Sequence, residues 1–370
     1  MVICLKIAIV HNALTDMGGS ERVVLTLAKA FGAPVYTSNY LQEKTFNGYK
    51  KLKIIEVHRT KEHRWGVMNA VNNVISTIRF SKIKELKMYD CVITSGVLAV
   101  FASKLNKNNI WYCHTPNRTL YDLYEQIRNQ YSWIGWKPAL ISAVKFWRHF
   151  DQKAVMHVNK LVANSMNVRK RIRKFYGREA IVINPPVSIE KFYHRSAEDY
   201  WLSTQRIVPE KRIDMQVKIF KRLPHEKLII AGEATPGHDW YKRKLQEMIG
   251  KMKNIEWKGA VRDEEMTELY ANCKGVIQTS IDEDFGLVPV EAMAAGKPCL
   301  AVNEGGFSET IIHGKTGLLI NKPYVGSFIK AIKNFAPEDF SPKLCRKRAE
   351  DFSEDSFVQK IRNLVKPFGV

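Results

Sequence analysis

Short apolar runs alternate with stretches of helical periodicity along most of the chain. In the first half, the apolar runs lie at residues 5–10, 33–37, 53–57, 89–94, 109–113 and 161–165. Continuous runs of this kind are typical of strands buried on both faces, and strand–helix alternation predicts a parallel sheet covered by helices on both sides. Ligands of such sheets bind beyond the carboxyl ends of the strands. Polar residues that directly follow an apolar run are therefore candidate site residues.

The length of 370 residues accommodates two domains with complete cores. A second set of apolar runs lies near residue 201 and at residues 228–232, 255–259 and 275–279. Between the two sets, Pro185 and Pro186 cannot continue a helix or a central strand, and they predict a stiff linker. We therefore expect an amino-terminal domain at residues 1–187 and a carboxyl-terminal domain at residues 188–352.

The formal net charge is +21, which predicts a polyanionic partner such as nucleic acid, anionic lipid or a phosphorylated substrate. The basic residues are spread over both halves, without zinc-finger spacing or an aromatic RNP strand. A nucleic-acid-binding protein without catalysis is therefore only a distant alternative, and no specific nucleic acid is expected. The six cysteines form no Cys-x-x-Cys pair and predict buried thiols in a reducing compartment. No apolar run reaches membrane-spanning length, so we expect a cytoplasmic protein, at most peripheral at the cytoplasmic membrane face.

An acidic turn followed by a short helix occupies residues 281–300, with Glu283 and Glu291 eight positions apart. Between the two carboxylates lie Phe285, Gly286 and Leu287. Pro289 suits the first helical position, because it has no N–H to leave unpaired. The amides just before it would then point at a bound anion. Donors flanked by two carboxylate acceptors are what a sugar nucleotide needs.

The spacing from Glu283 to Glu291 matches the Glu-x7-Glu motif of retaining GT-B glycosyltransferases of family 4. The stretch Glu-Asp-Phe-Gly-Leu-Val-Pro-Val-Glu-Ala resembles their mannosyltransferase branch. This resemblance implies an α/β fold of the GT-B type, two Rossmann-like domains facing each other across a cleft. It also implies that a terminal helix at residues 353–370 crosses back to the acceptor-side first domain. The implied activity is transfer of a hexose from a nucleotide diphosphate sugar to a glycan or lipid-linked acceptor, with retained configuration and without a cofactor or metal.

Three further motifs carry the resemblance. Gly18 and Gly19 open a helix after the first apolar run, where the family contacts the donor diphosphate, although such a pair can also be a simple tight turn. His114 ends an aromatic run within Cys-His-Thr-Pro-Asn-Arg, a pattern in which the family's histidine faces the transferring sugar. Arg206 and Lys211 have the spacing of the family's cations at the donor diphosphate. Taken alone, such a histidine is more often a surface residue or a satisfied core residue, and the two bases would be unremarkable surface residues.

The resemblance implies that these residues contact different parts of the donor. Arg206, Lys211, Gly19 and the amides of residues 285–287 would hold the charge of the departing diphosphate. Glu291 would bind the ribose, and Glu283 and His114 would contact the transferring sugar. The expected donor is GDP-mannose, with UDP-glucose or another UDP-hexose as the alternative.

Other interpretations of these segments stay open. Glu291 could simply be favoured by the helix dipole, and Asp282-Glu283-Asp284 spells the Asp-x-Asp pattern of metal-dependent glycosyltransferases. Residues 131–150, rich in aromatic and basic side chains, fit either a helix packed on its own domain or one at an anionic membrane surface. In the second case the anchor would contain Trp133, Trp136, Phe146 and Trp147, and the basic run 169–174 would surround it.

Overall fold

The computed structural model describes residues 5–59, 67–125, 137–235 and 237–369. Contacts divide the chain into two compact units. Unit 1 comprises Met1–Pro185 and Phe357–Val370, and unit 2 comprises Pro186–Ser356. The division falls within the proline pair at which the sequence predicts a linker.

Within the described residues, unit 1 contains a seven-stranded sheet of order β3-β2-β1-β4-β5-β6-β7, in which all neighbours are parallel. Its strands are β1 (Ile7–His11), β2 (Val35–Thr37), β3 (Ile54–Glu56), β4 (Cys91–Ser95), β5 (Asn109–Cys113), β6 (Lys160–Ala163) and β7 (Ile181–Val182). Every residue of β1, β4 and β5 is buried, as continuous apolar runs predict. The expected parallel sheet is confirmed, and its order reverses between β1 and β4.

Helices cover the sheet of unit 1. They are α1 (Gly19–Phe31), α2 (Val67–Phe80), α4 (Lys137–Met156), α5 (Met166–Tyr176) and α13 (Glu354–Val365). The last of these inserts Phe357, Ile361 and Val365 into the core that contains β1. The first strand and the last helix therefore belong to the same unit.

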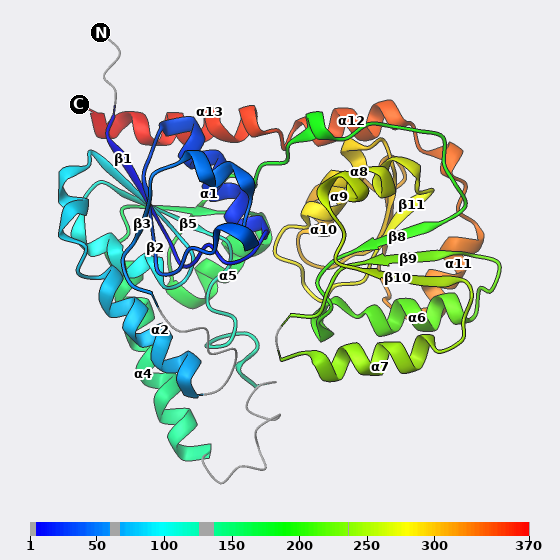
Figure 1. Ribbon diagram of the computed structural model, residues 1–370, viewed down its shortest axis with the longest axis horizontal. Helices are drawn as coiled ribbons and strands as arrows, with labels where there is room; N and C mark the ends of the chain where they lie inside the picture. Colours follow the sequence, from blue (N-terminus) through cyan, green and yellow to red (C-terminus); the bar gives the residue numbers. More distant parts are fainter. Residues whose placement is uncertain (1–4, 60–66, 126–136, 236, 370) are drawn as a thin grey trace. The chain divides into compact units, whose positions relative to one another are not determined.

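Unit 2 contains, within the described residues, a six-stranded parallel sheet of order β10-β9-β8-β11-β12-β13. Its strands are β8 (Trp201–Thr204), β9 (Leu228–Ala231), β10 (Ile255–Gly259), β11 (Gly275–Gln278), β12 (Cys299–Val302) and β13 (Gly317–Ile320). Its helices are α6 (Ile213–Lys221), α7 (Asp239–Ile249), α8 (Asp263–Asn272), α9 (Leu287–Ala294), α10 (Phe307–Thr310), α11 (Val325–Lys333) and α12 (Pro342–Glu350). Helices α6 and α7 lie on one face of the sheet, and α8 and α9 lie on the other (Figure 1).

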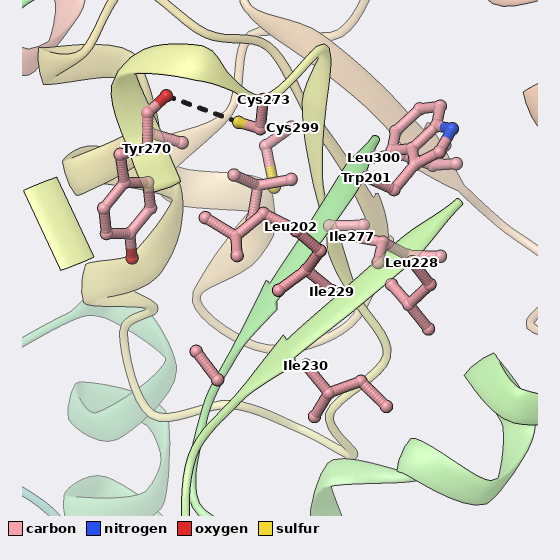
Figure 2. Packing of buried hydrophobic residues seen from close by; sticks show 14 of the residues in the cluster. Trp201, Leu202, Leu228, Ile229, Ile230, Tyr270, Cys273, Ile277, Cys299 and Leu300 are labelled. Atoms are coloured by element: carbon pink, nitrogen blue, oxygen red, sulfur yellow. Dashed lines mark hydrogen bonds between the residues drawn. The ribbon is translucent and has the colours of Figure 1, made fainter. Parts of the chain in front are cut away.

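The core of unit 2 is built from the central strands and the helices on both faces. Figure 2 shows Trp201, Leu202, Ile229 and Ile277 packed together, with Tyr270 of α8 at the side. The described cysteines are free thiols and are all buried, as the sequence predicts: Cys91, Cys113, Cys273, Cys299 and Cys345. A continuous core on both faces holds the carboxyl ends of the strands in fixed positions, and those ends carry the candidate site.

Candidate active site

Three loops of unit 2 meet beyond the carboxyl ends of β8, β11 and β12. The loop after β11 is tied to the loop after β8 by a bond from Ile281 N to Glu210 O of 2.8 Å. It is tied to the loop after β12 by a bond from Gly306 N to Glu283 O, also of 2.8 Å. The strand order reverses between β8 and β11, and such a reversal is where open parallel sheets bind ligands.

Lys211 and Glu283 form an ion pair at this edge. The Lys211 Nζ to Glu283 Oε2 distance is 2.5 Å, and the two side chains are only 17% and 20% exposed. Burial raises the pKa of Glu283. The charge and hydrogen bond of Lys211, with smaller contributions from Ser280 and Arg206, lower it by more than burial raises it, so the pKa of Glu283 is below its ordinary value. Glu283 is therefore ionised at neutral pH and accepts a hydrogen bond from Lys211.

Arg206 adds an exposed cation to the same loop. Its charge reaches Glu283, whose pKa it helps to lower. Within the described part of the chain, no hydrogen bond or ion pair joins the Arg206 guanidinium to another side chain. The structure thus brings Arg206, Lys211 and Glu283 together, as the family resemblance implies, and leaves one of the two cations available to a ligand.

Helix α9 begins directly after these residues. Gly286 precedes it with a positive φ of 90°, and a side chain there would lie 2.7 Å from the Phe307 ring. The expectation that Pro289 takes the first helical position is wrong, because the helix already begins at Leu287. Pro289 is the third helical residue. N–H groups in the first turn have no acceptor within the helix, so a proline there, which has no N–H, costs no hydrogen bond.

Phe285, Gly286 and Leu287 differ in what they offer a ligand. The Phe285 side chain is 2% exposed and packs edge-on against Phe352, so it anchors the turn within the core. Leu287 is half-buried and begins the helix. A ligand at this helix end would therefore meet backbone amides and not the phenyl ring.

Glu291 lies on α9, one turn beyond the helix start, and is held by α8. Tyr270 donates a hydrogen bond of 2.7 Å to Glu291 Oε2, and the Tyr270 hydroxyl lies 2.8 Å from Thr204 Oγ1 at the end of β8. This connection to β8 is more specific than a favourable interaction with the helix dipole. The sequence does not reveal Tyr270, because it lies within an ordinary amphipathic helix.

A close approach at Gly306 and a second ion pair, between Arg212 and Glu304, hold the acidic turn in place. A Cβ on Gly306 would lie 2.3 Å from Phe285 Cα, so only glycine permits this approach. Arg212 Nη2 contacts Glu304 Oε2 at 2.6 Å, and the Asp282 amide donates to the same oxygen at 3.4 Å. Sequence reasoning missed Arg212 and Glu304, since each looks like an isolated surface charge.

In unit 1, Gly18 and Gly19 begin α1, and His114 follows β5 directly. Gly18 is the residue that caps α1, and its carbonyl accepts a bond of 3.1 Å from Arg22 N. His114 Nε2 lies 2.9 Å from the Ser95 hydroxyl at the end of β4. Burial and the charge of His11 lower the pKa of His114 to about 3, although Glu21 opposes this change. His114 is therefore neutral at neutral pH.

Two further polar residues of unit 1 are connected to His114 through Ser95, and sequence reasoning missed both. His11 ends β1, and its Nδ1 lies 3.0 Å from the Ser95 carbonyl oxygen, while its Nε2 lies 3.5 Å from Glu21 Oε1. Burial raises the pKa of Glu21, but His11 and Ser20 outweigh it and lower the pKa to about 2. His11 and Ser95 each directly follow an apolar run, the same signal that marks His114, whereas nothing local marks Glu21.

The alternative interpretations meet mixed outcomes. Among the described residues, no three or more His, Cys, Asp or Glu side chains are grouped so as to hold a metal ion. The basic run 169–174 is not wholly solvated, because Arg171 is 6% exposed and donates to Thr115 Oγ1 at 2.9 Å. Trp133 and Trp136 lie outside the described residues. Across the described ranges, no helix is long and apolar enough to span a bilayer.

Comparisons with known proteins show which proteins this chain resembles in sequence and in fold. Residues 187–354 match the family described as glycosyl transferases group 1. Alpha-1,3/1,6-mannosyltransferase ALG2 of Dictyostelium discoideum is 25% identical to this chain over 98% of both sequences. Among solved structures, sucrose-phosphate synthase of Thermosynechococcus elongatus has a TM-score of 0.78 at 15% identity, over 98% of both chains. HepE of Anabaena, in complex with UDP and glucose, has a TM-score of 0.75 at 17% identity, over 98% of this chain and 99% of that one.

The fold and the matched family together define the class of protein: the chain is a glycosyltransferase with the GT-B fold. The match to glycosyl transferases group 1 covers nearly all of unit 2, and the enzyme is a hexosyltransferase.

Proposed function

We propose that this enzyme transfers mannose from GDP-mannose to a glycan or lipid-linked acceptor, with retained anomeric configuration and without a metal ion. The observation that carries the proposal is the Lys211–Glu283 pair beside the start of α9, in a chain similar over nearly its whole length to a mannosyltransferase. Departure of a nucleoside diphosphate leaves negative charge on its phosphates. Fixed cations and oriented amides stabilise such charge best where water is partly excluded.

Each residue of unit 2 has a part in this proposal. Lys211 and Arg206 hold the diphosphate, together with the amides of residues 285–287. Glu283, kept ionised by Lys211, accepts hydrogen bonds from hydroxyls of the transferring sugar. Glu291, oriented by Tyr270, accepts them from the ribose.

In unit 1, the same proposal gives a donor role to Gly19 and a sugar contact to His114. Gly19 begins α1, so its amide is one of the donors that an α-helix leaves unpaired in its first turn. His114 is neutral at working pH, so it can orient a hydroxyl group by hydrogen bonding.

A thermal-shift panel with GDP-mannose, GDP, UDP-glucose, UDP and ADP tests the donor. A ligand at about 100 times its Kd stabilises the fold by about 2.7 kcal/mol, whereas nucleotides that do not bind leave the melting temperature unchanged. We expect the guanine nucleotides to stabilise and the others to have no effect. Stabilisation by the uridine compounds alone would overturn the assignment of the donor.

The second candidate is a UDP-hexose-dependent transferase of the same fold. It is favoured by the similarity to HepE, whose structure contains UDP and glucose. The carboxylates and cations described above serve either donor, because they contact ribose, phosphate and sugar but not the base. The thermal-shift panel separates the two candidates.

We further propose that the enzyme works at the cytoplasmic face of an anionic membrane, through the exposed side of α4. Phe146 and Phe150 are 59% and 39% exposed, with ring centroids 4.6 Å apart. Lys145, His149 and Lys153 share this exposed side. Aromatic rings flanked by basic residues suit a bilayer interface, and each lysine near an anionic surface contributes about 1 kcal/mol.

Vesicle co-sedimentation tests the membrane proposal. Binding should rise with the fraction of phosphatidylglycerol, fall with salt, and drop when Phe146 and Phe150 are both changed to serine. Trp240→Ser is the matched control, since Trp240 is an equally exposed aromatic residue (48%) on α7 of unit 2. If wild type ignores anionic vesicles at low salt, the acceptor is soluble and the positive charge serves phosphorylated substrates alone.

A further inference from the structure

A buried chain of polar groups leads to His114 in unit 1. It runs from Glu21 at the start of α1 through His11 at the end of β1 and Ser95 at the end of β4. His11 is 2% exposed and Ser95 is fully buried. The chain crosses the point where the strand order of the sheet reverses, between β1 and β4. Nothing in the proposed function so far uses His11, Glu21 or Ser95.

The positions of the hydrogen atoms follow from the partners. His11 Nδ1 lies 3.0 Å from the Ser95 carbonyl oxygen, which can only accept, so Nδ1 carries a hydrogen. The same nitrogen lies 3.2 Å from Ser95 Oγ and therefore cannot accept from that hydroxyl. Within the described residues, the remaining acceptor for the Ser95 hydroxyl hydrogen is His114 Nε2, at 2.9 Å. A fully buried hydroxyl is expected to make this bond.

These constraints select one form of the His114 ring. If Nε2 accepts from Ser95, the hydrogen of the neutral imidazole must be on Nδ1. The His114 ring also packs against Tyr112 in a T-shaped contact with centroids 5.1 Å apart, and the Tyr112 hydroxyl donates to Ile183 O at 2.9 Å. The ring is therefore fixed both in orientation and in tautomer. Its Nδ1–H has no partner among the described residues and is left for a ligand.

We infer that Ser95 is a positioning residue, which His11 and Glu21 orient so that His114 presents a permanent Nδ1–H donor to an oxygen of the transferring sugar. The inference rests on the proposed function for the identity of the sugar, but not for the state of the ring. It assigns His114 a hydrogen-bonding role at neutral pH and not that of a general acid or base. The low pKa of His114 agrees with this role, because burial and the charge of His11 disfavour its protonation.

Nitrogen-15 NMR of histidine-labelled full-length protein tests the inference, with the His114 signals assigned by loss in His114→Gln. In wild type we expect a neutral ring protonated at Nδ1, with no titration from about pH 5 to about pH 9, because the pKa of about 3 lies well below this range. Ser95→Ala should give a mixture of tautomers, and Ser95→Thr, which keeps the hydroxyl, should restore the single form. A wild-type ring protonated at Nε2, or an unchanged tautomer in Ser95→Ala, would overturn the inference.

Kinetics of the same variants provide the second readout. Ser95→Ala should lower kcat roughly five- to tenfold while the KM for the donor changes by less than about twofold, since one oriented hydrogen bond is lost in the transition state. Thr94→Val is the matched control: Thr94 is the preceding residue of β4, its buried hydroxyl contacts Ser103 and Ile110, and its side chain points to the opposite face. Equal losses in both variants would overturn the positioning role. If the donor is not GDP-mannose, the NMR result is unaffected, so the two proposals fail separately.

Discussion

Replacement of Lys211 by methionine removes the charge that pairs with Glu283 and keeps the length of the side chain. The pair distance is 2.5 Å and both side chains are less than a quarter exposed, so solvent screens the interaction only in part. A charge-assisted hydrogen bond of this kind contributes about 1.5–3 kcal/mol. If Lys211 transfers that interaction to the departing diphosphate, kcat/KM should fall roughly ten- to hundredfold.

The same change should alter the titration of Glu283. In wild type, burial raises the pKa of Glu283 and Lys211 more than offsets it, so the folded pKa lies below the ordinary value of 4.5. A lowered carboxylate pKa stabilises the fold above about pH 4.5, and this stabilisation is lost as the pH falls. Without Lys211 the pKa of Glu283 rises, so the acid limb of the rate profile should move to higher pH.

Initial rates of nucleotide release, measured from about pH 4 to about pH 9, test both effects. Lys218→Met is the control, because Lys218 lies on α6 close by in sequence, pairs with Asp214 at 3.3 Å, and is 54% exposed. Exposed pairs contribute little, so this variant should stay within about twofold of wild type. Near-normal efficiency of Lys211→Met would remove Lys211 from the mechanism, and an unmoved acid limb would refute the account of Glu283.

The remaining predictions concern other parts of both units. Glu291→Gln should weaken calorimetric binding of free nucleoside diphosphate, whereas Glu283→Gln should leave it nearly intact and lower turnover; equal loss of binding would contradict the roles given to them. Gly306→Ala should lower the free energy of unfolding by about 1–3 kcal/mol, because the added Cβ would overlap the acidic turn. Gly326→Ala should not, because a Cβ there has no neighbour within 4 Å. Burial raises the pKa of Asp151 to about 6, so the folded protein takes up a proton there as the pH falls from about 7 to about 5. Over this range the free energy of unfolding of wild type should rise by on the order of 1 kcal/mol relative to Asp151→Asn, and the same pH dependence in both proteins would refute this. Turnover should persist in EDTA, and activity restored only by manganese would instead support a metal at the acidic turn.

The strands and the candidate residues at their ends were predictable because the signals are local. Continuous apolar runs mark β4 and β5, although the run at residues 89–94 is displaced from the strand Cys91–Ser95. His114 directly follows β5, as its position after an aromatic run predicts. The start of α9 was predicted wrongly. Proline is only favoured at the first helical position, whereas the turn at Gly286, with its positive φ, makes the helix begin at Leu287, two residues before Pro289.

The partners of the site residues were not predictable in the same way. Lys211 and Glu283 are 72 positions apart, and His11 and Ser95 are 84 apart. Such pairs depend on the order of strands in the sheet, which places the ends of β8 and β11, or of β1 and β4, next to each other. Periodicity predicts each strand but not its neighbours, so the hydrogen-bond networks become visible only in the folded chain.

The central claim is that this chain is a metal-independent GDP-mannose transferase, and a competition between donors tests it most directly. Equimolar GDP-mannose and UDP-glucose are incubated with the enzyme, EDTA and a polyprenol-linked glycan acceptor, and the released GDP and UDP are separated and quantified. We expect GDP to accumulate with the enzyme in EDTA, and the sugar-transfer product to retain the α configuration of the donor. Release of UDP alone, or release of GDP only after manganese is added, would contradict the account.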